Sequence, residues 1–250
     1  MEFADVARMV EGVPNMSPAQ GRRIYDFILE HRMTDVLELG TAHGTSACYM
    51  AAALHQVGRG RVLTIDRPDS LQRDPNIFEL LDRTGLKPFV EVVTSPSSYD
   101  WELMKIIKRR SRLERSEPLF DFCYLDGAHT WQTDGLAFFL VEKLLRRGGW
   151  ILFDDLDWTF HRSSTLRETD WVLALPEEER TAPQMKRVFE FLVRQHVGFD
   201  SFQIDEEWGW GWARNARNTT MRPLPPKVAL RRFAGGILRR LGLRRPKAQA

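Results

Sequence analysis

The chain has 250 residues, 43% of them hydrophobic, and its 36 Lys and Arg nearly balance its 34 Asp and Glu, for a net charge of +2. This composition predicts a globular protein with a sizeable core and excludes a fibrous or largely disordered chain. The sequence contains no run of about 18 apolar residues, so no membrane span is predicted. The first residues lack the pattern of a secretory signal. The two cysteines suggest no disulfide framework. We therefore expect a cytoplasmic protein.

Helical and extended patterns alternate along the chain from residue 18 to residue 154. Ser17 and Pro18 have the pattern of a helix cap followed by proline at the first helical position, and apolar residues then recur with helical spacing over 18–32. Short apolar runs predict strands at 35–39, 61–66, 90–93, 120–126 and 150–154, with helices between them at 46–54, 75–84, 98–115 and 131–146. This order predicts a Rossmann-like α/β fold with a doubly wound, mostly parallel sheet.

The alternation ends after the fifth predicted strand. Residues 155–182 are predicted to form a long, irregular insertion on the substrate side, and loops of this length are often functional. A helix at 184–196 and two strands at 199–204 and 208–213 follow. Because the link between these strands is short, we expect an antiparallel hairpin at the edge of a seven-stranded sheet.

Tryptophan alternates with glycine in the last predicted strand, at Trp208, Trp210 and Trp212. Because side chains alternate along a strand, the three indoles share one face. They form either an aromatic wall for an acceptor molecule or a face buried against a helix or against the second subunit of a homodimer.

Charged residues are distributed unevenly along the chain. From Trp208 onward there are eleven Arg and Lys and no Asp or Glu, whereas the preceding residues are acidic on balance. We divide the chain into a domain at 1–214 and a basic, partly amphipathic tail at 215–250. Apolar residues with helical spacing among arginines are typical of a solvated tail, of a segment that contacts anionic membrane or of one that binds nucleic acid. The acidic domain argues against nucleic acid.

A glycine-bearing turn follows the first predicted strand. Val36–Leu39, the turn from Gly40 to Gly44 and the helix from Ser46 have the order of a nucleotide-binding α/β unit, and glycine lets a ligand approach the backbone. Asp66 ends the second strand, where a carboxylate suits the ribose of NAD or of S-adenosylmethionine equally. The third glycine of the dinucleotide pattern is missing, which makes an NAD-linked oxidoreductase the less favoured alternative.

These motifs resemble those of class I S-adenosylmethionine-dependent methyltransferases. More narrowly, they are similar to the metal-dependent O-methyltransferases of the catechol O-methyltransferase kind and to natural-product and cephalosporin hydroxylase-like families. The resemblance covers residues 14–155 and is carried by Asn15-Met16-Ser17, Val36–Ser46, Ile65-Asp66, Leu125–His129 and Gly148–Asp155.

The resemblance implies a set of residues that bind S-adenosylmethionine. Met16 would close over the cofactor, Gly40 and Gly44 would pass the backbone beneath its amino-acid part, and Ser46 would bind its carboxylate at a helix N-terminus. Asp66 would hold the ribose, and Ser95 or Ser97 would face the adenine. Glu38 either belongs to this set or accepts hydrogen bonds from the N–H groups of the turn.

Three carboxylates follow two neighbouring predicted strands: Asp126 after the fourth, and Asp154 and Asp155 after the fifth. Neighbouring parallel strands lie about 4.8 Å apart and end at the same edge of the sheet, so the carboxylates should converge where ligands bind. A divalent cation such as Mg²⁺ would offset their repulsion. The alternative is that they cap turns and helices. The resemblance assigns metal ligation to the same three positions.

Asp126 and His129 are the candidate catalytic residues. His129 lies three residues after Asp126, where the resembling enzymes hold a Lys or His that can accept the acceptor's proton. His43 and His161 are the competing histidines. The sequence thus predicts Mg²⁺-assisted O-methylation of a small-molecule hydroxyl on a natural product, sugar or aromatic compound. A non-catalytic or hydroxylase-associated cofactor-binding module of the same fold is the alternative.

Overall fold

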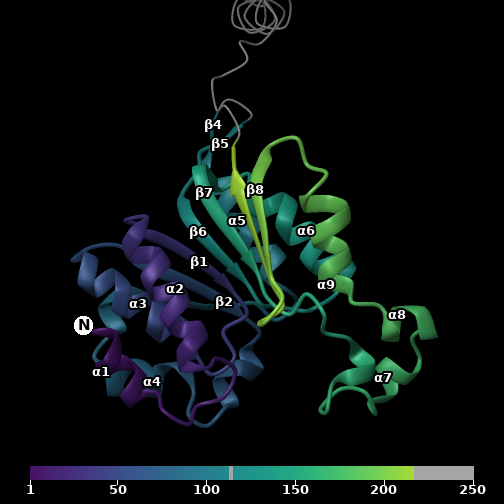
Figure 1. Cartoon of the computed structure of the whole chain (residues 1–250), viewed down its shortest axis with the longest axis horizontal. Helices are drawn as coiled ribbons and strands as arrows, with labels where there is room; N and C mark the ends of the chain where they lie inside the picture. The colour runs from purple at the N-terminus through teal and green to yellow at the C-terminus, as the bar shows by residue number, and fades with distance from the viewer. Residues whose placement is uncertain (113–114, 217–250) are drawn as a thin grey trace, which may run out of the picture. The chain divides into compact units, whose positions relative to one another are not determined.

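The computed structural model describes residues 1–112 and 115–216 (Figure 1). Within these residues one mixed sheet has seven strands in the order β3-β2-β1-β6-β7-β9-β8. These strands are β1 (Asp35–Leu39), β2 (Arg61–Asp66), β3 (Val90–Thr94), β6 (Phe120–Leu125), β7 (Leu145–Phe153), β8 (Phe199–Asp205) and β9 (Trp210–Asn215).

The sheet has the predicted doubly wound topology. β1 pairs in parallel with β2 and β6, β2 pairs with β3, and β6 pairs with β7. β9 runs antiparallel to both β7 and β8, so the predicted hairpin lies at the edge. The chain moves outward from β1 to β3 and then returns to β6 on the other side of β1. In such sheets ligands bind beyond the carboxyl ends of the strands, where the order reverses.

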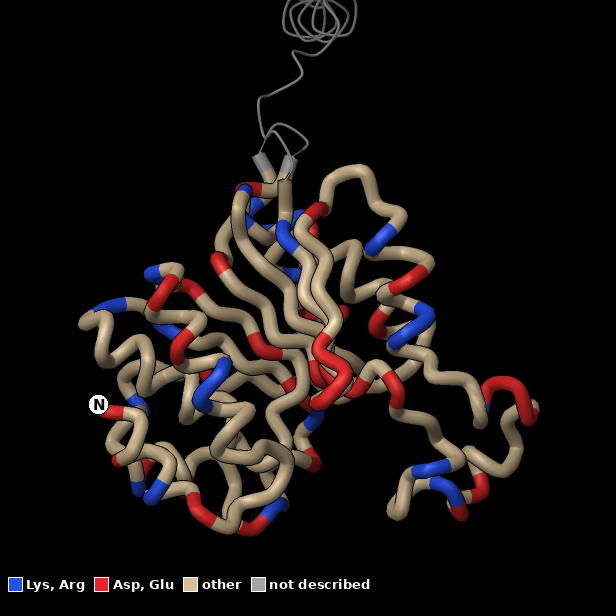
Figure 2. Tube along the Cα trace, in the orientation of Figure 1, with Lys and Arg blue, Asp and Glu red and all other residues tan. Residues whose placement is uncertain are grey.

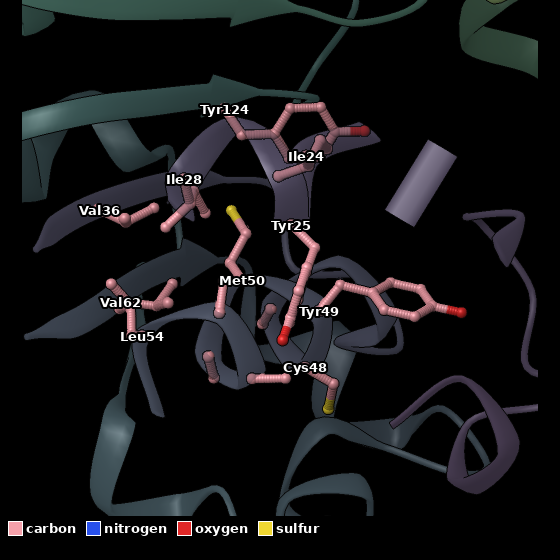
Figure 3. Packing of buried hydrophobic residues seen from close by; sticks show 14 of the residues in the cluster. Ile24, Tyr25, Ile28, Val36, Cys48, Tyr49, Met50, Leu54, Val62 and Tyr124 are labelled. Carbon is pink, nitrogen blue, oxygen red and sulfur yellow. The ribbon is translucent and has the colours of Figure 1, made fainter. Parts of the chain in front are cut away.

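Helices cover both faces of the sheet because successive strand residues point to opposite sides. α1 (Phe3–Met9), α2 (Pro18–Glu30), α3 (Thr45–Val57) and α4 (Ile77–Thr84) pack over one core cluster. α5 (Tyr99–Arg110), α6 (Trp131–Glu142), α9 (Gln184–Arg187) and the π-helical η4 (Val188–Val193) pack over the other. Figure 3 shows the first cluster, where residues of α2 and α3 lie against Val36 and Val62 of the sheet.

The start of α2 follows from its sequence. The Ser17 side chain accepts from the Gln20 N–H, the Gln20 side chain accepts from the Ser17 N–H, and Pro18 occupies the first turn. This reciprocal capping satisfies two of the backbone donors that a helix leaves open at its start. Ile24, Phe27 and Ile28 then face the core at helical spacing.

Two predicted helices end earlier than expected. The helix predicted at 98–115 ends at Arg110 and is followed by a short hairpin of β4 (Ser111–Arg112) and β5 (Arg115–Ser116). The helix predicted at 131–146 ends at Glu142 because Leu145 already pairs with Phe120 as the first residue of β7. Gly148 and Gly149 lie inside β7.

The insertion after β7 is only partly helical, as predicted. It contains η3 (Phe160–Arg162), α7 (Asp170–Leu173) and α8 (Glu177–Thr181), and 3-10 turns also occur at η1 (Pro68–Gln72) and η2 (Lys87–Phe89). Among the described residues, no helix is long and apolar enough to cross a membrane. The predictions for the basic tail fall, from Arg217 onward, outside the described residues.

Candidate active site

The glycine turn lies at the carboxyl end of β1 and touches the end of β6. Gly40 has a φ of +98°, and a Cβ at this position would lie 1.8 Å from the backbone oxygen of Asp126. Gly44 has a φ of +92°, and its Cβ would lie 2.7 Å from the Ile77 side chain. Both glycines are therefore required by packing within the protein as well as by their left-handed backbone. The turn and the end of β6 are therefore in direct contact at the carboxyl edge of the sheet.

Asp66 shapes this turn from the end of β2. Its Oδ2 accepts hydrogen bonds from the backbone N–H groups of Thr41 at 2.8 Å and Ala42 at 2.9 Å. Its Oδ1 accepts from the N–H of Arg67 at 2.7 Å. Asp66 thus holds the turn in place, and its role toward a ribose stays a prediction.

Glu38 is a fully buried carboxyl beneath the turn. Its Oε1 accepts from the hydroxyl of Ser46, whereas its Oε2 has no hydrogen-bond partner. Burial raises the pKa of Glu38 to about 8, although the Ser46 hydrogen bond opposes the shift. Buried polar atoms are nearly always paired, so the open oxygen indicates a place for a polar group of a ligand.

The remaining predicted cofactor residues differ in exposure. Ser95, just after β3, is fully buried and its hydroxyl lacks a partner, whereas Ser97 is exposed. Met16 is buried in the first core cluster. The segment that precedes Met16 is hydrogen-bonded to α3: the Thr45 hydroxyl donates to the backbone oxygen of Pro14 at 3.0 Å. Of the two serines, Ser95 therefore carries the open hydroxyl.

Asp126, His129 and Asp155 form the acidic cluster where β6 and β7 end. One ligand atom from each lies within 4.8 Å of the others. The Nε2 atom of His129 is 3.1 Å from Oδ1 of Asp126 and 3.4 Å from Oδ2 of Asp155. Figure 2 shows acidic residues near the carboxyl ends of the strands. The structure therefore brings together two of the three predicted metal ligands and the predicted base.

Charge and backbone geometry are both unusual in this cluster. Burial alone would lower the pKa of His129, but the hydrogen bond to Asp126 and the charges of Asp126 and Asp155 raise it to about 9. His129 and Asp155 have φ angles of +55° and +54°. Such left-handed conformations cost roughly 1–3 kcal/mol each in residues other than glycine and are concentrated at functional sites.

Asp154, the third predicted metal ligand, is not one of the three residues of the cluster, although the Tyr124 hydroxyl that it contacts also lies 3.3 Å from Oδ2 of Asp126. It is buried, and its Oδ1 accepts from the indole N–H of Trp210 and from the backbone N–H of Asp155, both at 2.7 Å. Its Oδ2 accepts from the hydroxyl of Tyr124. Burial and the charges of Asp126 and Asp155 raise the pKa of Asp154 well above its usual range.

Trp210 and Trp212 lie in the core, and Trp208 packs against the same cluster at its edge. The rings of Trp208 and Trp210 meet edge to face, with centroids 4.9 Å apart. Of the two alternatives for the alternating tryptophans, the core face is confirmed for Trp210 and Trp212. The aromatic residue beside the cluster is instead Trp158 of the insertion, whose ring centroid is 4.8 Å from that of His129.

A buried pair, Tyr99 and Asp134, holds the loop that carries His129. The Tyr99 hydroxyl donates to Oδ1 of Asp134 and accepts from the N–H of Ala128 at 3.2 Å. Oδ2 of Asp134 accepts from the N–H of Thr130 at 2.8 Å. Sequence reasoning missed this pair, although polar residues on the buried faces of two predicted helices were the available signal.

The competing histidines lie outside the cluster. The Nδ1 atom of His43 is 2.7 Å from the backbone oxygen of Pro75, and His161 is an exposed residue of η3. Among the described residues, His129 is the histidine in contact with both carboxylates.

Comparison with known proteins supports the Rossmann-like fold described above. Residues 37–156 match the model of a family described as a methyltransferase domain. The chain matches no curated protein sequence.

Three solved structures illustrate the structural similarity. An O-methyltransferase from Bacillus cereus in complex with SAH is 19% identical, with 86% of this chain and 92% of that chain covered and a TM-score of 0.58. TomG from Streptomyces achromogenes, an O-methyltransferase involved in tomaymycin synthesis and in complex with SAM, is 18% identical, with 86% and 89% covered and a TM-score of 0.56. Cofactor-bound Rv0187 from MTB is 21% identical, with 86% and 88% covered and a TM-score of 0.58. At these identities the solved structures show the fold alone, which is the Rossmann-like α/β fold predicted from the sequence.

Proposed function

We propose that the chain is an S-adenosylmethionine-dependent O-methyltransferase that acts on a small-molecule hydroxyl with the help of a divalent cation. The observation that carries this proposal is the contact between the glycine turn and the acidic cluster. Gly40 packs directly against the backbone of Asp126, so a cofactor above the turn and an acceptor at the cluster would lie side by side. Methyl transfer is an in-line displacement in which such positioning provides much of the rate.

The residues around the turn fit the methyl donor, which supplies an activated methyl group when bound. Two buried polar atoms there, Oε2 of Glu38 and the hydroxyl of Ser95, lack partners and would pair with the donor's polar groups. Asp66 would hold the ribose at the end of β2, and Ser46 would contact the cofactor's carboxylate at the start of α3. Gly40, Gly44 and Met16 would shape the cavity around it. Similar structures in complex with SAM or SAH support this choice of cofactor.

The acidic residues at the ends of β6 and β7 fit a divalent cation because carboxylate oxygens are common ligands for such ions. Asp126 and Asp155 present such oxygens beside His129, and the neighbouring carboxyl of Asp154 shares the Tyr124 hydroxyl with Asp126. A bound cation would orient the acceptor's hydroxyl and lower its pKa. Mg²⁺ or another divalent ion would suit this role.

His129 and the insertion complete the acceptor side. With both carboxylates facing it, the raised pKa of His129 keeps its proton in place at neutral pH, so the imidazole must first lose that proton to act as a base. Trp158 presents an aromatic ring beside His129. Its position supports an acceptor with a flat, apolar surface next to the hydroxyl that is methylated.

Two measurements test this function. Isothermal titration of the full chain with S-adenosylmethionine should show saturable binding, and a screen of phenols, sugars and hydroxylated natural products should then show methyl transfer. The variant D126N should reduce transfer at least tenfold, whereas D157N should not, because Asp157 forms an exposed ion pair with Lys186 at 2.8 Å. Absence of S-adenosylmethionine binding, with or without a divalent cation, contradicts the proposal.

A further inference from the structure

We propose that the cleft between α8 and the start of α6 is a subsite for the part of the acceptor that lies away from the methylated hydroxyl. We infer that this part is an organic cation, a protonated or quaternary amine on an apolar skeleton. The inference rests on the proposed function and adds to it the chemical class of the acceptor. The cleft has a volume of about 360 Å³, and sites for small molecules usually have roughly 300–1,000 Å³.

Two exposed aromatic rings line the cleft. Trp131 comes from the first residue of α6 and Phe191 from η4, and the two residues are 39% and 50% exposed. Large aromatic side chains are mostly buried in folded proteins, and their exposure together in a concave site is typical of a surface that a ligand covers. The rings therefore indicate a ligand with an apolar skeleton.

One buried side chain joins the parts of the cleft. Gln184 is 7% exposed. Its Oε1 accepts from the backbone N–H of Trp131 at 2.7 Å, and its Nε2 donates to the backbone oxygen of Glu179 at 3.0 Å. This amide ties the start of α6 to α8, so the cleft is formed before a ligand binds. Preformed sites bind more tightly because less ordering is needed on binding.

The charges in the cleft favour a cation. α8 begins with three consecutive glutamates (Figure 2), of which Glu178 and Glu179 line the cleft. Arg187 also lines it, and its Nη1 lies 4.0 Å from Oε1 of Glu178, so these two charges offset each other. Within the described ranges, the Glu179 carboxylate has no ion pair. Aromatic faces attract ammonium groups as well, so the rings and Glu179 suit the same ligand.

Two loops connect the cleft with the candidate active site. Trp131 lies two residues after His129, and two residues span at most about 7 Å. On the other loop, Leu156 directly follows Asp155, and its backbone oxygen accepts from the N–H of Lys186 in α9 at 3.1 Å. α9 also supplies residues to the cleft. Both loops that carry the acidic cluster thus lead into the cleft, which places the subsite next to the methylated hydroxyl.

The first test measures binding of benzyltrimethylammonium to the full chain labelled with 5-fluorotryptophan, in the absence of S-adenosylmethionine. The fluorine resonance of Trp131, assigned by its absence from W131F, should shift saturably. Phenylacetate, an aromatic anion, should cause no saturable shift at the same concentrations. Equal affinity for the two probes, or no shift of the Trp131 resonance with either, overturns the inference.

Matched variants separate the cleft from the surrounding charge. E179Q and F191L should each weaken binding of benzyltrimethylammonium at least threefold. E177Q should change it less than twofold, because Glu177 belongs to the same turn of α8 but does not line the cleft. F139L is the corresponding control for F191L, since Phe139 is an exposed aromatic residue of α6 outside the cleft. Equal losses in E177Q and E179Q contradict the inference.

The second test connects the cleft with methyl transfer. For an acceptor found in the screen, benzyltrimethylammonium should raise the apparent KM of that acceptor without changing kcat, and E179Q should raise KM at least threefold. Inhibition that is not competitive with the acceptor overturns the assignment as an acceptor subsite. A chain that binds S-adenosylmethionine but not benzyltrimethylammonium refutes this inference alone. A chain that binds the cation but not S-adenosylmethionine refutes the proposed function, while the preference of the cleft for a cation stands.

Discussion

The indole N–H of Trp210 donates to Oδ1 of Asp154 at 2.7 Å, although the two residues lie 56 positions apart in the sequence. This bond links the core strand β9 to the acidic end of β7. It explains why two adjacent aspartates, both at the end of one strand, have different surroundings. Asp154 is buried among donors, and Asp155 is left to face His129.

The bond between Trp210 and Asp154 should stabilise the fold measurably. W210F removes the donor and leaves a buried carboxylate oxygen with one partner fewer, which should lower the free energy of unfolding by about 1–3 kcal/mol beyond the lost packing. Urea denaturation measures the change. W212F removes an indole from the same core cluster and controls for packing. If W210F and D154A lower stability additively in the double variant, the bond contributes little.

Glu38 should make stability depend on pH. Its pKa is about 8 in the folded chain, against an ordinary value of 4.5, so the folded state binds more protons than the unfolded state between these values. Stability should therefore fall as pH rises through this window, with a slope approaching 1.4 kcal/mol per pH unit from this group alone. E38Q should remove that contribution. Urea unfolding of both proteins at pH 5, 6, 7 and 8 measures the difference, and parallel curves would contradict the expectation.

Gly40 should tolerate no side chain, whereas Gly58 should tolerate one at modest cost. Both have a left-handed backbone, but a Cβ at Gly40 would meet the oxygen of Asp126 at 1.8 Å, and a Cβ at Gly58 would have nothing within 4 Å. G58A should cost about 1–2 kcal/mol from the backbone alone. G40A should cost about 1–3 kcal/mol more and weaken binding of S-adenosylmethionine. Thermal unfolding and isothermal titration compare the two variants, and equal destabilisation would show that the turn can move away from β6.

The hydroxyl of Tyr99 should hold the His129 loop. Y99F leaves the N–H of Ala128 without this acceptor and Oδ1 of Asp134 without this donor, which should cost about 1–3 kcal/mol. Amide hydrogen exchange should become faster at residues 127–130 in particular. Y25F is the matched control, because the buried Tyr25 hydroxyl donates to the backbone oxygen of Met1 at 3.0 Å, away from this loop. Unchanged exchange at 127–130 in Y99F would mean that other contacts hold the loop.

The sequence alone was sufficient to predict the sheet and the glycine turn. The strand from Asp35 to Leu39 and the strand from Arg61 to Asp66 have the predicted bounds, and Ser17 caps the following helix as expected. These features depend on local chemistry: apolar periodicity, a capping side chain, and glycine where the backbone is left-handed. The doubly wound, mostly parallel topology followed from the alternation of strands and helices.

Tertiary pairing decided where the later helices end. Polar residues continue past Arg110, so composition alone gave no sign that α5 stops there. Leu145 belongs to β7 because Phe120 pairs with it. Nothing in the sequence around residue 145 identifies Phe120 as the partner. The first helix, α1, is short and has no capping side chain, so no local signal predicted it.

The tertiary structure also determined the different surroundings of the site residues. The sequence placed Asp126, His129, Asp154 and Asp155 at one edge, because parallel strands end together. It could not distinguish Asp154 from Asp155, since both follow the same strand and carry the same chemical group. Only the folded chain brings Trp210 and Tyr124 to Asp154 and leaves Asp155 beside His129. Hydrogen-bond donors from distant strands determine which carboxylate is buried in the core and which is available to a ligand.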